Sequence, residues 1–216
     1  MKSERELQLE RLLQRFMEPI KGIPFEIVIQ SLCGVAVTEF DRDDPANQNF
    51  LIKIADALTE VCDLIKKTPI ERPRPNEVGN DIEPFVVSAL KGQGLDAACP
   101  KTKSGAGKST GYPDIRLKVG DSIIFLEIKT YNRANHSTTQ RSFYLSPSTN
   151  PKVHEDGIHL LAAFEVVREG NHFWPVAYEV VDLYGLDCDM KAEFNSDNKR
   201  LYEEKRVLVK RRIEDI

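Results

Sequence analysis

The chain has 216 residues, of which 41% are hydrophobic and 30% are charged, a balance typical of a globular protein with one core or a core and a small appendage. Its longest apolar runs are too short to cross a bilayer, and its first residues are charged instead of forming the apolar core of a secretion signal. These features argue against a membrane protein, and we expect a cytoplasmic protein with no membrane partner.

The net charge of −4 is unevenly distributed along the chain. Residues 101–154 hold nine Lys and Arg against three Asp and Glu, and residues 199–212 hold seven against two, so the rest of the chain is strongly acidic. Basic segments of this kind suit contact with a polyanion. For the C-terminal tail, a solvated helix or strand face is an equally good interpretation.

The first third of the chain is predicted to be mainly helical. Residues 3–17 begin with the capping-box pair Ser3 and Glu6 and carry an apolar stripe at helical spacing. A second helix begins at Asp44, a good N-cap, with Pro45 at the first helical position.

Two further segments lie in or next to this helical part of the chain. Residues 25–37 are rich in Val and Ile, and their pattern does not distinguish a strand from a buried helix. Residues 70–80 are mostly polar and contain two prolines, which indicates a linker. We therefore divide the chain into a helical N-terminal region, 1–70, and a second part, 71–216.

The second part has the pattern of an α/β domain. A helix is expected over residues 81–91, a flexible basic loop over 101–111 and a partly helical tail from Asp187. Period-two alternation and apolar runs predict four strands, the first two joined as a hairpin, at residues 114–119, 122–131, 158–167 and 173–181. The expected fold is an α/β core with a central mixed sheet flanked by helices, preceded by the N-terminal helical region.

Asp114, Glu127 and Lys129 are the candidate catalytic residues. Asp114 opens the first strand of the hairpin, and Glu127 and Lys129 lie two residues apart on the second. Residues i and i+2 of a strand point to the same face, so Glu127 and Lys129 project together while Ile128 points into the opposite, apolar face. We expect Asp114 to lie across the ladder from Glu127.

This arrangement of charges favours a metal site. Two converging carboxylates repel each other unless a cation lies between them, and oxygen ligands with open water positions suit Mg²⁺. A neighbouring lysine can stabilise charge on a phosphate or activate a water molecule. The alternative is an exposed turn aspartate beside an ordinary Glu/Lys strand face. The otherwise apolar strand SIIFLEIK argues against it, because buried charges need partners or a metal.

With Pro113-Asp114 and Glu127-Ile128-Lys129, residues 77–181 resemble the PD-(D/E)xK nuclease superfamily, most closely its type II restriction endonucleases. The resemblance implies a restriction-endonuclease-like core in a prokaryotic protein that cuts DNA. It implies that Asp114, Glu127 and the carbonyl of Ile128 bind Mg²⁺ and that Lys129 assists the nucleophile. It also implies a helix glutamate, for which Glu83 fits best and Glu77 is the alternative.

Two polar segments are the candidate DNA contacts. In the basic loop they are Lys103, Ser104 and Lys108. After the Glu-Ile-Lys strand they are Asn132, Arg133, Asn135, His136, Thr138, Thr139, Gln140 and Arg141. A phosphate-binding loop is not expected at SGAGKST, because Thr102 stands where that motif needs its first glycine, and we expect no nucleotide cofactor.

The leading hypothesis is a Mg²⁺-dependent endonuclease that cuts double-stranded DNA at a specific short sequence. A palindromic site implies a homodimer, for which the N-terminal helices are a plausible interface. Two alternatives remain: a structure-specific repair or junction-resolving nuclease of the same superfamily, and a DNA-binding module without catalysis.

Overall fold

The computed structural model describes residues 2–18, 20–74, 77–107, 110–139, 143–192 and 194–211. The chain forms two compact units, one of residues 1–22 with 189–216 and the other of residues 23–188. Position 70, the boundary expected from sequence, lies inside the larger unit, which also holds all the candidate site residues.

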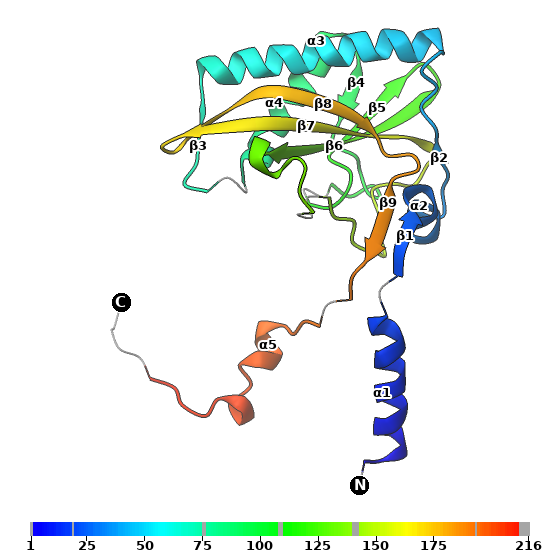
Figure 1. Ribbon diagram of the computed structural model, residues 1–216, viewed down its shortest axis with the longest axis vertical. Helices are drawn as coiled ribbons and strands as arrows, with labels where there is room; N and C mark the ends of the chain where they lie inside the picture. The colour runs from blue at the N-terminus through cyan, green and yellow to red at the C-terminus, as the bar shows by residue number, and fades with distance from the viewer. Residues whose placement is uncertain are drawn as a thin grey trace. The chain divides into compact units, whose positions relative to one another are not determined.

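A mixed sheet forms the centre of the larger unit (Figure 1). Its strands run in the order β3-β8-β7-β6-β5-β4, with β2 beside β7; β7 is parallel to β6 and β2, and the other neighbours are antiparallel. The strands are β2 (Val37–Thr38), β3 (Ile70–Glu71), β4 (Asp96–Ala98), β5 (Ile115–Val119), β6 (Ser122–Tyr131), β7 (Gly157–Glu169) and β8 (His172–Asp182). The four strands expected from sequence are therefore confirmed, and β2, β3 and β4 are additions to them.

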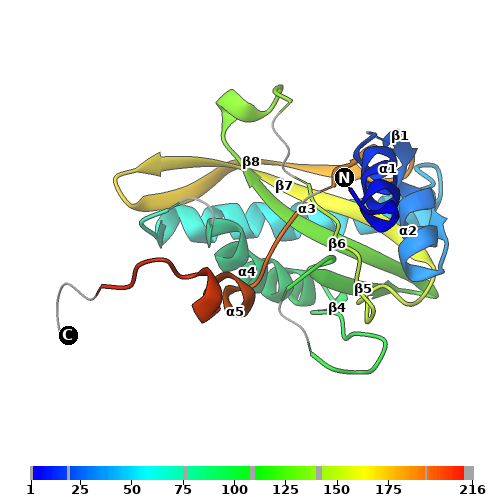
Figure 2. The same ribbon diagram turned by 90° about the horizontal axis from the view of Figure 1, so that it is seen from below.

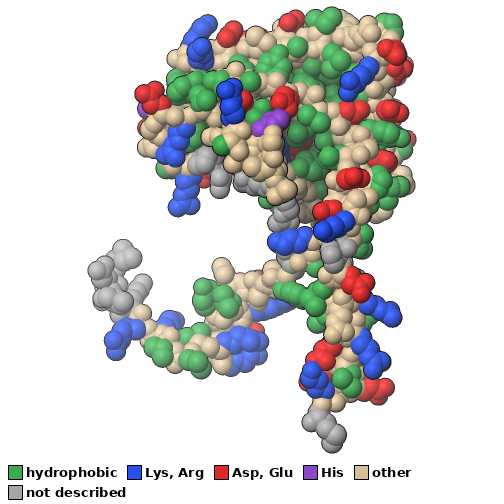
Figure 3. Space-filling model, in the orientation of Figure 1, with side chains coloured by type: hydrophobic (Ala, Val, Ile, Leu, Met, Phe, Trp, Pro, Cys, Tyr) green, Lys and Arg blue, Asp and Glu red, His purple; other side chains and the backbone are tan. Residues whose placement is uncertain are grey.

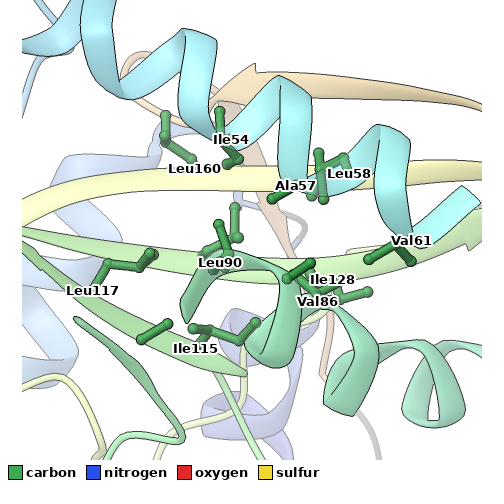
Figure 4. Close-up of a cluster of buried hydrophobic side chains, with 14 of the residues drawn as sticks. Ile54, Ala57, Leu58, Val61, Val86, Leu90, Ile115, Leu117, Ile128 and Leu160 are labelled. Carbon is green, nitrogen blue, oxygen red and sulfur yellow. The ribbon is translucent and has the colours of Figure 1, made fainter. Parts of the chain in front are cut away.

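Two helices, α3 (Pro45–Lys67) and α4 (Val78–Gly92), cover one face of this sheet. The helix α3 begins as expected, since the Asp44 carboxylate accepts hydrogen bonds from the first free amides of the helix. In Figure 4, Leu58 of α3 and Val86 of α4 point toward Ile128 of β6, which is 3% exposed. Ile128 thus faces the apolar side, as its place between Glu127 and Lys129 predicts.

The opposite face is covered by α2 (Phe25–Cys33). Its fully buried Phe25 and Ile29 pack with Phe125 of β6, whose side chain points away from α3 and α4. Residues 25–37, which the pattern left undecided, therefore contain a helix, which ends at Gly34 with a φ of 74°, and then β2. The prediction of a mixed sheet flanked by helices is confirmed, and the architecture is consistent with a restriction-endonuclease-like core (Figures 1 and 2).

The segment 70–80, expected to be a linker, contributes to the sheet and to a helix. Its first residues form β3 beside β8, and α4 begins at Val78, three residues earlier than expected. Arg72, which follows β3, donates two hydrogen bonds of 2.7 Å to Asp81 of α4. Proline and polar composition indicated a linker and did not reveal the strand or the start of the helix that this segment contains.

The smaller unit contains α1 (Glu4–Met17) and, after β9 (Asp187–Met190), the short helices α5 (Asn198–Leu201) and η3 (Glu204–Arg206). The strand β9 pairs with β1 (Ile20–Pro24). The capping box of Ser3 and Glu6 is present, and all residues of α1 are described and none is buried. Lys and Arg side chains are visible along the C-terminal segment in Figure 3. No helix of the described residues is both long and apolar enough to span a membrane.

Candidate active site

The β5–β6 hairpin brings Asp114 and Glu127 together. The register pairs Ile115 with Leu126, so Asp114, immediately before β5, lies beside Glu127. The Asp114 carboxylate accepts a 2.8 Å hydrogen bond from the backbone amide of Ile128. Lys129 projects on the same side as Glu127, and its ammonium group lies 2.5 Å from Glu127 Oε1. The three residues expected to meet across the hairpin therefore do so.

The Glu127 carboxylate is held in an unfavourable place for a charge. Glu127 is 4% exposed, and its Oε2 atom has no hydrogen-bond partner among the described residues. Burial and the neighbouring Asp114 raise the pKa of Glu127 to about 7, although Lys129 and Lys152 act in the opposite direction. A bound cation would relieve the unfavourable charge of a buried carboxylate that lies beside a second carboxylate.

Glu83 of α4 belongs to the same cluster. Burial raises the pKa of Glu83 to about 7, with further increases from Asp114 and Glu127. Glu77, the alternative, precedes α4, is exposed and lies 3.7 Å from Arg72 in an ion pair. The geometry therefore places Glu83, and not Glu77, beside the acidic pair.

These side chains line one cavity of about 440 Å³. Asp114, Glu127 and Lys129 line it from the hairpin and Glu83 lines it from α4, while residues 144–148 and 150–153 line another part of its wall. The cavity is large enough to admit part of a nucleotide, and the charged groups converge on it.

The donor set fits a hard divalent cation. No three His, Cys, Asp or Glu side chains of the described residues lie close enough to hold a metal by themselves. Asp114 and Glu127 supply two carboxylates. The carbonyl oxygen of Ile128 accepts a 3.3 Å hydrogen bond from Lys129 Nζ and so belongs to the same cluster. Two carboxylates and one carbonyl that leave room for water are the ligand type that Mg²⁺ accepts.

Similarity to known proteins places the chain among the type II restriction enzymes. The family model of the type II restriction enzyme MjaV family matches residues 19–205. The chain belongs to this family. It is also 33% identical over 217 residues to the type II restriction enzyme MjaV of Methanocaldococcus jannaschii, covering 93% of this chain and 94% of that protein. No solved structure matches the chain. The expectation of a type II restriction enzyme, a site-specific deoxyribonuclease, is confirmed.

In this restriction enzyme the predicted basic loop is folded into a tight hairpin over residues 101–107. Lys101 bridges to Gly107, and the Asn150 side chain accepts a hydrogen bond from the Ser104 amide (3.1 Å) and donates one to Ser104 Oγ (2.8 Å). The backbone amide of Lys103 donates to Pro151 (3.0 Å). The loop is thus attached to the wall of the cavity, with Lys103 and Ser104 exposed. Lys108 lies outside the described residues.

The candidate DNA-contact segment after β6 projects beyond the sheet (Figure 2). Asn132 caps the short helix η2 (Arg133–Asn135). Arg133 lies 2.9 Å from Glu165 of β7, and His136 lies 3.1 Å from Glu179 of β8. Thr138 and Thr139 are exposed, as are the other described members of the set, and none of them lines the cavity. Gln140 and Arg141 lie outside the described residues.

Sequence reasoning missed Lys152. Its side chain is 3% exposed, lines the cavity and lowers the pKa of both Glu83 and Glu127. No sequence signal marks a lysine between Pro151 and Val153 in a polar stretch. His159, also buried, is hydrogen bonded to Tyr112 (2.7 Å), and burial lowers its pKa to about 3, so it is a neutral core residue.

Proposed function

We propose that this restriction enzyme cuts double-stranded DNA at a specific short sequence by Mg²⁺-dependent hydrolysis, with a PD-(D/E)xK active site. The supporting observation is the buried Glu127 Oε2, which has no partner among the described residues, in a carboxylate whose pKa is raised by burial and by the neighbouring Asp114. Asp114, Glu127 and the carbonyl of Ile128 would hold the cation. When bound, Mg²⁺ would polarise the scissile phosphate and lower the pKa of a water ligand.

Lys129 and Glu83 complete the chemistry from the protein side. The Lys129 ammonium group, held by Glu127 Oε1 and the Ile128 carbonyl, is placed to donate a hydrogen bond to a phosphate oxygen, on which negative charge grows during attack. Glu83 has a pKa of about 7, so near neutral pH its carboxylate can accept a proton from the attacking water. It can also position that water through a hydrogen bond.

DNA would be bound by the basic surfaces around the cavity. The hairpin 101–107 is fixed to the cavity wall through Asn150, so Lys103 and Ser104 would meet the phosphate backbone beside the scissile bond. The segment that begins with Asn132 and Arg133 projects from the end of the strand that carries Glu127. Its amide, hydroxyl and guanidinium groups suit base edges and phosphates.

We further propose a homodimer in which α1 contributes to the interface. Leu9, Leu12, Leu13 and Phe16 form an apolar stripe on this helix, and Phe16 is 64% exposed. An amphipathic helix is stabilised mainly by packing of its apolar face. A second copy of the enzyme would provide that packing with the two-fold symmetry of a palindromic substrate.

Cleavage of phage DNA tests the proposed function. We expect discrete bands with Mg²⁺ and intact DNA with EDTA. Asp114→Ala and Lys129→Ala should abolish cleavage while DNA binding, measured by gel shift with Ca²⁺, survives. Asp121→Ala is the matched control, because Asp121 is an exposed acid in the turn of the same hairpin, and it should cut normally.

The alternatives give different results in the same assay. Cutting only at branched or damaged substrates would favour a repair or junction-resolving nuclease. Binding without cutting under all metal conditions would favour a non-catalytic module. Full activity of Asp114→Ala or Lys129→Ala would refute the assignment of the active site.

A further inference from the structure

Lys152 is a buried cation whose partners are mostly backbone carbonyl groups. Its ammonium group donates hydrogen bonds to the carbonyls of Gly111 (2.7 Å) and Pro113 (3.0 Å). A charged group that is 3% exposed is costly to desolvate, and two carbonyl dipoles compensate only part of that cost. Lys152 also lies close enough to the acidic cluster for its charge to lower the pKa of Glu83 and of Glu127.

The two carbonyls lie in the segment that leads into Asp114. The carbonyl of Pro113 belongs to the peptide plane that ends at the Cα atom of Asp114, so holding this oxygen fixes the orientation of the plane. From there the Asp114 carboxylate reaches the Ile128 amide at 2.8 Å. Lys152 therefore acts on one end of the carboxylate pair, while Lys129 contacts the other end, Glu127.

Lys152 is itself held rigidly. The carbonyl of the preceding Pro151 accepts a hydrogen bond from the amide of Lys103, and the following Val153, 1% exposed, packs in the core beneath α2. The carbonyl of Lys152 accepts a 2.9 Å hydrogen bond from His154. A long side chain on a fixed backbone can determine where the Gly111–Pro113 segment lies.

We infer that Lys152 is a positioning residue of the active site, which orients Asp114 for cation binding through the carbonyls of Gly111 and Pro113. This inference rests on the proposed function, because it assigns to Asp114 the role of a ligand. A positioning role and a purely electrostatic role of Lys152 predict opposite changes in cation affinity when the lysine is removed. A positive charge in the cavity repels a divalent cation, so its removal alone would strengthen cation binding. Loss of the correct Asp114 geometry would weaken it.

Lys152→Met is the test variant, since it keeps the length of the side chain and removes the donors and the charge. Arg116→Met is the matched control. Arg116 of β5 donates hydrogen bonds of 2.6 Å and 3.1 Å to Glu155, so it also links the hairpin to the 150–155 segment, but it does not line the cavity. Each variant loses a link from the 150–155 segment, Lys152→Met to the residues that lead into the hairpin and Arg116→Met to the hairpin itself.

The first measurement is the affinity for Mn²⁺ in the absence of DNA, with electron paramagnetic resonance used to detect the bound ion. We expect about tenfold to 100-fold weaker binding by Lys152→Met, the range found when residues that orient metal ligands are removed. Arg116→Met should bind Mn²⁺ like the wild type. Unchanged or tighter binding by folded Lys152→Met would overturn the inference.

The second measurement is single-turnover cleavage of DNA with Mg²⁺. We expect a loss of about 100-fold for Lys152→Met, the size of effect that a displacement of about 1 Å can have, with DNA affinity in Ca²⁺ unchanged within about threefold. A decrease in cleavage rate of the same size in Arg116→Met would show that Lys152 only stabilises the fold, and would overturn the inference. If Lys152→Met does not fold by circular dichroism, Lys152→Gln replaces it, with the same directions expected.

The two proposals fail in different ways. A wild type that cuts no DNA under any metal condition refutes the proposed function. A wild type that cuts, beside a Lys152→Met variant with unchanged rate and Mn²⁺ affinity, refutes the role of Lys152 alone.

Discussion

Glu127→Gln should stabilise the metal-free enzyme while abolishing its activity. Glu127 is 4% exposed, and its pKa is raised from 4.5 to about 7 by burial and by Asp114. The folded protein therefore prefers the protonated carboxyl. The stability that this preference provides is complete below about pH 4.5 and is lost as the pH rises through about 7. Glutamine has the shape of the protonated form and does not ionise.

The size of the gain follows from the pKa. A difference between 4.5 in the unfolded chain and about 7 in the folded protein corresponds to about 3 kcal/mol above pH 7 and about 1 kcal/mol near pH 5.5. The attraction to Lys129 is already included, because it acts on the same pKa. For a domain of this size the gain at high pH corresponds to an increase in Tm of about 6 to 12 °C.

Urea unfolding in EDTA at about pH 8 and pH 5.5 measures both values. Glu155→Gln is the control of opposite sign, since hydrogen bonds from Arg116 lower the pKa of Glu155 and its neutralisation should destabilise the protein at pH 8. Mg²⁺ should raise the stability of the wild type and leave Glu127→Gln unchanged. A Glu127→Gln variant less stable than the wild type at pH 8, or a gain that does not shrink at pH 5.5, would refute the reasoning.

Three further predictions concern the metal, the DNA and the dimer. The Mg²⁺ concentration for half-maximal cleavage should rise as the pH falls below about 7, because protons compete for Glu127 and Glu83; a constant value between about pH 6 and 8 would contradict it. Arg133→Ala should weaken DNA binding and reduce the slope of log affinity against log salt by about one, and an unchanged slope would exclude a phosphate contact. Phe16→Glu should convert the dimer into a monomer in sedimentation without unfolding it, whereas a dimer that persists would place the interface elsewhere.

The hairpin and its catalytic triplet could be predicted from sequence because strand periodicity and a short turn are local properties. Once β5 and β6 pair across the turn at Gly120, the register alone brings Asp114 beside Glu127. The choice between Glu83 and Glu77 could not be made in this way. It depends on tertiary contacts: Glu77 pairs with Arg72, whereas Glu83 lines the cavity, and no periodicity reveals either contact.

Short strands and loop contacts were beyond prediction for a related reason. The strands β2 and β3 have two residues each and exist because β7 and β8 offer a partner. Residues 25–33 have an apolar pattern that fits a strand or a buried helix. They form a helix, in which Phe25 is buried against the sheet. Lys152 belongs to the active site because the chain around it, residues 144–148 and 150–153, lines the cavity.

The polar stretch of residues 132–152, of which only residues 132–141 are predicted from sequence to contact DNA, divides into two parts in the structure. Its later part, up to Lys152, forms the cavity wall. Its first part continues directly from β6, which is hydrogen bonded to β5 on one side and to β7 on the other. Glu127, Lys129 and Arg133 therefore lie on or beside one rigid element. DNA bound by the residues after β6 would be held at a fixed distance from the carboxylates. The strand β6 would then position both the residues that recognise DNA and those that cleave it.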